Sequence, residues 1–167
     1  SVCLYQGEEL GLTEADIKFE DLQDPTGIQF WPQYKGRDGC RTPMPWDASL
    51  ENAGFGAGKP WLPIEPAHQQ VSAAAQESDP GSVLNFYRKA IAARQASKAL
   101  RTGSIEMVEA SETLLVIRRK SGEETITCVF NFGEAPAAVP TAYAGQVILA
   151  TDGGAVKLAP FGFLWLR

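Results

Sequence analysis

From residue 104 onward, the hydrophobic and polar positions follow the pattern of β-strands. Apolar and polar residues alternate in short runs, with the period of two expected of strands that bury one face. The runs are rich in β-branched and aromatic residues, and Gly, Pro, Asp and Ser separate them. This pattern predicts an antiparallel β-sandwich with hairpin turns at residues 121–123 and 152–154. The expected strands cover residues 104–110, 113–120, 124–132, 145–150, 155–158 and 161–166.

A helical pattern precedes these strands. Asp79 is a suitable N-cap residue, and Pro80 after it suits the first helical position, so we expect a helix from Asp79 to about Ser97. Basic residues occupy its later turns, where they favour the carbonyl end of the helix dipole. Apolar residues spaced three and four apart form one face of it, namely Val83, Phe86, Tyr87, Ala90 and Ile91.

The first hundred residues have a weaker pattern. Residues 2–5 are a short apolar run that ends before Gly7, which fits either a buried strand of a parallel sheet or the end of a helix. Residues 11–35 are polar and acidic, with turns and short helices expected. Within them Phe30 and Trp31 form an aromatic island. They fit a platform for a sugar ring, although local packing is the favoured interpretation.

The segment at residues 36–47 has to be a loop. Pro43 and Pro45 fix φ and remove backbone donors, while Gly36 and Gly39 permit positive φ. It carries two arginines, two carboxylates and a tryptophan, so it is a shaped loop that holds polar side chains in place. Such loops often carry function. The alternative is a surface loop with solvated Arg–Asp pairs, and composition favours neither.

Composition and charge narrow the class of protein. The 167 residues are 44% hydrophobic and 21% charged, which is a normal globular mixture. A net charge of −5 and a pI near 4.9 argue against nucleic acid or an anionic membrane surface as partner. We see no transmembrane-length apolar run and no basic flank of a signal peptide.

The few cysteines and the single histidine suggest neither a disulfide framework nor a metal site. Cys3, Cys40 and Cys128 include no C-x-x-C pair, so we expect reduced thiols, no metal and a cytoplasmic location. Cys40 is interpreted as a plain loop cysteine rather than a reactive one. His68 lies in a polar stretch after a proline, and we expect it to be solvated.

Two motifs connect this loop to a known family. Residues 37–46 read RDGCRTPMPW, and residues 5–11 read YQGEELG. Together they resemble the α-glucosidase and oligo-1,6-glucosidase branch of glycoside hydrolase family 13, the α-amylase superfamily. The similarity continues through KPWLP at residues 59–63 and through the helix to the end of the chain.

The resemblance implies a C-terminal fragment of a larger enzyme. The expected fold is the last βα unit of a (β/α)8 TIM barrel, residues 1–100, in which the motif makes residues 2–5 the eighth strand. An antiparallel Greek-key β-sandwich, residues 101–167, follows it. In the family the catalytic carboxylates lie on earlier barrel strands. This chain therefore contributes no catalytic residue, and we expect it to be inactive alone. The adjacent Glu8 and Glu9 suggest a catalytic dyad, but the resemblance gives them a structural role at the barrel rim.

The implied function is that of a retaining exo-α-glucosidase that hydrolyses terminal α-linked glucose from short oligosaccharides or disaccharides, without a cofactor. Arg37 matches the family arginine that pairs with an early-barrel aspartate and grips glucose hydroxyls, for which a guanidinium fork is suited. Arg41 either lines the leaving-group side or braces the loop through Asp38 or Asp47. The partners implied are the sugar substrate and the N-terminal barrel portion. Linkage preference is left open.

Two other functions are compatible with parts of the sequence. The strands after residue 104 fit a free-standing, non-catalytic β-sandwich that binds carbohydrate or a protein partner. Membrane-anchored subunits of amino-acid transporters share the family fold, but this chain contains no membrane segment to support that interpretation.

Overall fold

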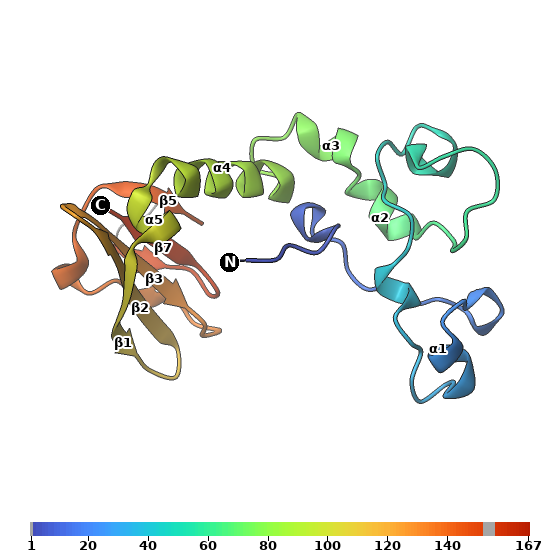
Figure 1. Cartoon of the computed structure of the whole chain (residues 1–167), viewed down its shortest axis with the longest axis horizontal. Coiled ribbons are helices and arrows are strands. Elements are labelled where there is room, and N and C mark those ends of the chain that lie inside the picture. The colour runs from blue at the N-terminus through green and yellow to red at the C-terminus, as the bar shows by residue number, and fades with distance from the viewer. Residues whose placement is uncertain (1, 152–155) are drawn as a thin grey trace. The chain divides into compact units, whose positions relative to one another are not determined.

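A computed structural model describes residues 2–151 and 156–167, which form two compact units, 1–87 and 88–167. The helices are α1 (Pro25–Gln29), α2 (Pro66–Gln70), α3 (Ala73–Glu77), α4 (Val83–Ala96) and α5 (Lys98–Thr102). Short 3₁₀ turns are η1 (Glu8–Leu10), η2 (Phe19–Asp21), η3 (Asp38–Cys40), η4 (Glu51–Gly54) and η5 (Thr141–Tyr143). The strands are β1 (Ser104–Ala110), β2 (Leu114–Ser121), β3 (Glu124–Asn131), β4 (Ala137–Ala138), β5 (Val147–Ala150), β6 (Lys157–Leu158) and β7 (Phe163–Leu166) (Figure 1).

The first unit consists of loops and short helices, and its described residues include no strand. The strand interpretation of residues 2–5 is therefore wrong for this chain. These residues are irregular, and Val2, Leu4 and Tyr5 are exposed. A parallel strand forms only when neighbours accept and donate its backbone hydrogen bonds, and the described part of this unit holds no other strand to do so.

A small apolar core stabilises the middle of the first unit. Ala15, Ile17, Leu22 and Leu62 are buried together, and Trp31 packs against them. The ring of Trp31 lies 5.7 Å from that of Phe19. Local packing is thus confirmed for Trp31. Phe30, its neighbour in the sequence, is exposed.

Helix α4 begins later than the sequence pattern predicted. Asp79 does not cap it, because its Oδ1 accepts the N–H of Gly81 at 2.8 Å in a tight turn. The N-cap is Ser82, whose hydroxyl accepts the N–H of Asn85 at 3.2 Å. None of the fourteen residues of α4 is buried, and Val83 and Ile91 of its apolar face are 42% and 43% exposed.

The second unit contains both β-sheets. One sheet has the order β1-β2-β3-β7-β5, and a two-stranded sheet pairs β4 with β6; all pairs are antiparallel. Each strand that the sequence predicted is present with slightly different ends, whereas β4 was not predicted. The hairpin at residues 121–123 is confirmed, with Gly122 at φ 59°. The second expected turn, at residues 152–154, lies outside the described residues, but β5 and β6 belong to different sheets and form no hairpin.

The five-stranded sheet is apolar on both faces. Between the two sheets lies a core built from alternating positions, namely Leu114, Val116, Val129, Val139, Leu158, Leu164 and Leu166. The opposite face packs on α5, where Ala99 and Leu100 cover Ile126 and Cys128. Burial of the thiol raises the pKa of Cys128 to about 11.

Two polar side chains connect the strands of the second unit to neighbouring segments. Glu124 accepts the N–H of Ala99 at 2.9 Å through Oε2 and pairs with Arg167 at 3.0 Å through Oε1. The N–H of Ala99, together with the hydroxyl of Ser97, holds the pKa of Glu124 below its usual value. Asn131, which is 1% exposed, ends β3 and forms hydrogen bonds with the loops beside it.

Candidate functional site

The loop at residues 36–47 is held by close backbone approaches. At Gly39 an added Cβ would lie 2.4 Å from the carbonyl oxygen of Ala15, and the N–H of Ala15 donates to the Gly39 carbonyl at 3.0 Å. Gly36 has a φ of 77°, and its Cβ would lie 2.9 Å from Oδ2 of Asp24. The two glycines therefore let the loop pack directly against the segments around Ala15 and Asp24.

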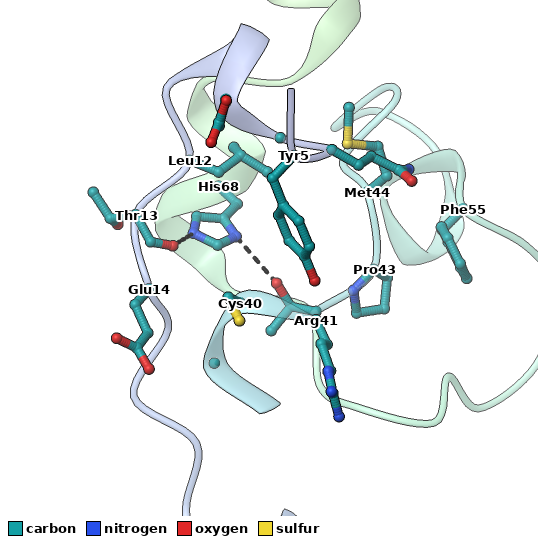
Figure 2. Close-up of a pocket in the computed structure, with 15 residues that line it drawn as sticks. Tyr5, Leu12, Thr13, Glu14, Cys40, Arg41, Pro43, Met44, Phe55 and His68 are labelled. Carbon is teal, nitrogen blue, oxygen red and sulfur yellow. Dashed lines mark hydrogen bonds between the residues drawn. The ribbon is translucent and has the colours of Figure 1, made fainter. Parts of the chain in front are cut away.

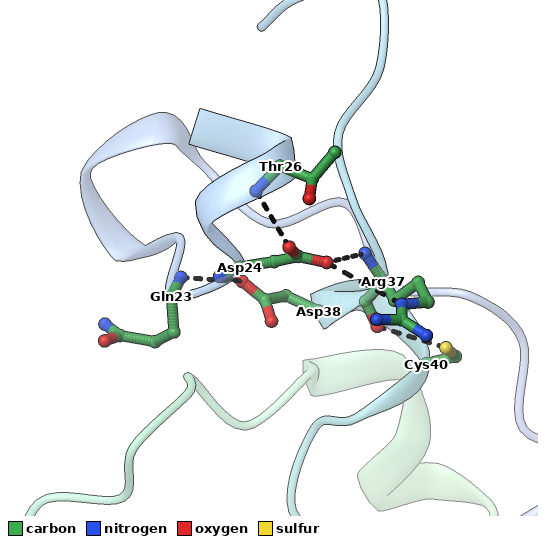
Figure 3. Close-up of polar contacts among 6 residues, drawn as sticks. All are labelled: Gln23, Asp24, Thr26, Arg37, Asp38 and Cys40. Carbon is green, nitrogen blue, oxygen red and sulfur yellow. Dashed lines mark hydrogen bonds and ion pairs between the residues drawn. The ribbon is translucent and has the colours of Figure 1, made fainter. Parts of the chain in front are cut away.

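Two buried carboxylates connect this loop to the start of α1, as Figure 3 shows. Asp24 accepts the N–H of Thr26 at 3.0 Å through Oδ1 and the N–H of Arg37 at 3.0 Å through Oδ2. Asp38 accepts the N–H groups of Gln23 and Asp24 at 2.6 and 2.7 Å, both through Oδ2. Its Oδ1 is buried and has no hydrogen-bond partner within the described ranges. Donation by Thr26, and then by Arg37, lowers the pKa of Asp24.

The two candidate arginines differ in their surroundings. Nε of Arg37 lies 3.9 Å from Oδ2 of Asp24, and 68% of the Arg37 side chain is exposed. Arg41 lines a pocket and, among the described residues, its guanidinium makes no ion pair. The bracing interpretation of Arg41 is therefore not supported. Asp38 bonds to backbone N–H groups, and Asp47 accepts the N–H and hydroxyl of Ser49.

The pocket has a cavity volume of about 380 Å³ and lies between the segments of the two motifs (Figure 2). Its wall combines charged, hydroxyl and apolar groups, a mixture that suits a neutral polar ligand. Arg37 does not line it. The side chains drawn around it in Figure 2 include Tyr5, Glu14, Arg41, Phe55 and His68.

The expectation for His68 was wrong. It is 3% exposed and lies in α2 rather than in a solvated loop. One ring nitrogen, Nε2, is 2.8 Å from the carbonyl oxygen of Thr13, and Nδ1 is 3.4 Å from the hydroxyl of Thr42. The imidazole thereby connects α2 to the segment at Thr13 and to the loop at Thr42, both of which line the pocket. Both partners are distant in the sequence, so no local signal indicated them.

The structure also places the paired glutamates and the cysteines that the sequence contains. Glu9 accepts the N–H of Gly7 at 2.9 Å, which matches a structural role, while Glu8 lines the pocket. Cys3 and Cys40 are exposed free thiols, and Cys128 is buried. Within residues 2–151 and 156–167 no three His, Cys, Asp or Glu side chains are placed to bind a metal ion. In the same residues no helix is long and apolar enough to cross a bilayer.

The sequence of the first unit and α4 decides the family. A family model described as "Alpha amylase, catalytic domain" matches residues 1–103, which include both motifs and the pocket. The chain belongs to the α-amylase family. A second model, described as a domain of unknown function (DUF3459), matches residues 107–165.

Two glucosidases are similar to most of this chain. It is 54% identical over 134 residues to a probable α-glucosidase of Rhizobium meliloti, covering 80% of this chain and 24% of the relative. It is 34% identical over 152 residues to an oligo-1,6-glucosidase of Parageobacillus thermoglucosidasius, covering 78% and 26%. The chain thus spans about a quarter of the length of these relatives.

Two solved structures are similar to nearly the whole of this chain. The α-glucosyl transfer enzyme XgtA is 43% identical with a TM-score of 0.82, and the match covers 99% of this chain and 32% of XgtA. The trehalulose synthase MutB of Pseudomonas mesoacidophila MX-45 is 28% identical with a TM-score of 0.80, covering 97% and 35%.

Proposed function

We propose that this chain is the C-terminal part of a retaining exo-α-glucosidase that releases terminal α-linked glucose from short oligosaccharides or disaccharides. The observation that carries the proposal is the 54% identity to a probable α-glucosidase over 134 residues, together with the match of the catalytic-domain model to residues 1–103. The catalytic carboxylates belong to the preceding part of the longer protein. The match of the catalytic-domain model to residues 1–103 favours this function over a free-standing binding module.

Within that enzyme Arg37 contributes to the subsite for the terminal glucose. Its exposed guanidinium extends from a backbone that is fixed by hydrogen bonds, and it has donors left for a carboxylate and for sugar hydroxyls. Arg41, on the wall of the pocket, lines the leaving-group side. Neither role needs a cofactor or a metal.

The proposed architecture is the end of a (β/α)8 barrel at residues 1–100 and a Greek-key β-sandwich at residues 101–167. The end of one family match at residue 103 and the start of the other at residue 107 support this division. The exposure of Val83 and Ile91 on the apolar face of α4, at 42% and 43%, supports its role as an outer barrel helix that packs on the barrel of the longer protein. The free cysteines favour a cytoplasmic location.

The test is Arg37→Ala in the longer gene product that carries these residues. We expect kcat/KM on maltose to fall by a factor on the order of 10² to 10³, because a charge-assisted substrate contact is lost. Arg37→Lys should restore little of the activity, since an ammonium group cannot donate as a fork.

The control is the isolated 167-residue chain, assayed for release of p-nitrophenol from its α-glucoside. No turnover is expected from it, because the carboxylate pair that glycosidases need lies elsewhere. Near wild-type kinetics of Arg37→Ala would remove Arg37 from the subsite. Turnover by the isolated chain would overturn the proposal that the catalytic groups precede it.

A further inference from the structure

We propose that Asp24 is a positioning residue for Arg37 and that Asp38 in turn holds Asp24. This inference rests on the proposed function, since it assumes that Arg37 contacts the substrate. Asp24 did not stand out in the sequence, where it lies in the polar and acidic segment at residues 11–35. Its surroundings give it a second task beside capping that helix.

The two oxygens of Asp24 divide these tasks. Oδ1 accepts the N–H of Thr26 at 3.0 Å, which is the ordinary N-cap contact of α1. Oδ2 is directed to the other segment, where it accepts the Arg37 N–H at 3.0 Å and lies 3.9 Å from Nε of the same residue. One carboxylate therefore fixes the backbone of Arg37 and attracts its guanidinium.

Asp38 completes a reciprocal pair of contacts. The side chain of Asp24 accepts from the backbone of Arg37, and the side chain of Asp38, the next residue, accepts from the backbone of Asp24 at 2.7 Å. Asp38 is fully buried, so its carboxylate has no solvent water to replace the N–H groups that it accepts. Neither segment can shift along the other without breaking a contact.

Positioning matters because the Arg37 side chain is long and 68% exposed. A free arginine of this kind samples many rotamers, and ordering it on substrate binding costs conformational entropy. A fixed backbone and a carboxylate beside Nε reduce the number of rotamers that Arg37 samples before substrate binds. Gly36 makes the arrangement possible, because a Cβ at that position would lie 2.9 Å from Oδ2 of Asp24.

The decisive variant is Asp24→Asn in the longer enzyme, because asparagine is also a good N-cap. Its oxygen can still accept from Thr26, but its NH₂ group then faces the N–H and guanidinium of Arg37. We expect kcat/KM to fall about 10-fold or more, with the same division between kcat and KM as in Arg37→Ala. Asp24→Ser keeps an N-cap residue, but its hydroxyl cannot reach Arg37, so it should show the same loss of kcat/KM. This variant replaces Asp24→Asn in the test if Asp24→Asn does not fold.

A double-mutant cycle separates positioning from general support of the fold. In an Arg37→Ala background, Asp24→Asn should change kcat/KM by less than about 2-fold, since its effect acts through the missing guanidinium. The matched control is Asp47→Asn, whose carboxylate contacts Ser49 and not Arg37, and which should remain near wild type. Thermal unfolding of every variant is recorded in parallel.

The outcomes distinguish this inference from the proposed function. If Arg37→Ala keeps wild-type kinetics, the proposed role of Arg37 fails. If Arg37→Ala is impaired while Asp24→Asn or Asp24→Ser is not, the positioning role alone is overturned. Equal losses from Asp24→Asn with and without Arg37 would likewise overturn it, because they would show a structural effect on the whole loop.

Discussion

Asn131→Asp tests whether one buried amide holds the end of β3 to the loops beside it. The Nδ2 group of Asn131 donates to the carbonyl oxygens of Ala135 and Ala159 at 2.9 and 2.8 Å, and Oδ1 accepts the N–H of Gly133 at 3.0 Å. Aspartate has the same shape, but it replaces the two donated bonds with a carboxylate oxygen facing two carbonyls. Two lost bonds at about 1 to 1.5 kcal/mol each, plus burial of an unpaired charge, give a destabilisation of about 3 to 5 kcal/mol.

The assay is urea unfolding of the 167-residue chain, followed by hydrogen exchange at the amides of β3 and β7. Gln146→Glu is the control, because it makes the same change of chemistry on an exposed side chain of the same unit. Protonation of the introduced carboxylate would restore one donor, so the difference from wild type should shrink as the pH falls. A loss below about 1 kcal/mol, or a loss that grows on acidification, would refute this account of the contacts.

Two further predictions concern titratable groups of the second unit. The pKa of Glu124 is lowered in the folded state, so its contact with Ala99 stabilises the fold above the unfolded-state pKa. This stabilisation is lost as the pH falls through the folded-state pKa. Glu124→Gln should therefore lose less thermal stability than wild type between about pH 6 and about pH 3. The buried thiol of Cys128, with its pKa raised to about 11, should resist a thiol reagent at about pH 8 in the folded chain, while the exposed thiols of Cys3 and Cys40 react. Equal reaction rates of the three thiols would show that the sheet face opens readily.

The β-strands could be predicted from the sequence because each of the longer ones buries alternate positions, as Val116 and Ile126 do on opposite faces of the sheet. The short strand β4, only Ala137–Ala138, has no period to detect and exists because β6 pairs with it. The start of α4 was misplaced since Asp79 fits both a cap and a turn, and the turn formed.

At the site, the sequence identified the loop but not what holds it. The prolines and glycines of residues 36–47 indicate a shaped loop, and Arg37 and Arg41 stand out by motif. The supporting contacts join residues far apart, such as His68 to Thr13, and no periodicity reports such pairs. Long-range partners of single polar side chains depend on the fold, so they emerged only with the structure.

The position of β7 has a consequence for biosynthesis. This strand lies between β3 and β5 and is the partner of both, yet it is made after them. During translation β5 has no strand to pair with, and the β3 edge stays open until Phe163–Leu166 has been added. Products of ribosomes that stop before Phe163 would carry two unsatisfied strand edges and an uncovered core, which marks them for aggregation or for removal by cellular quality control.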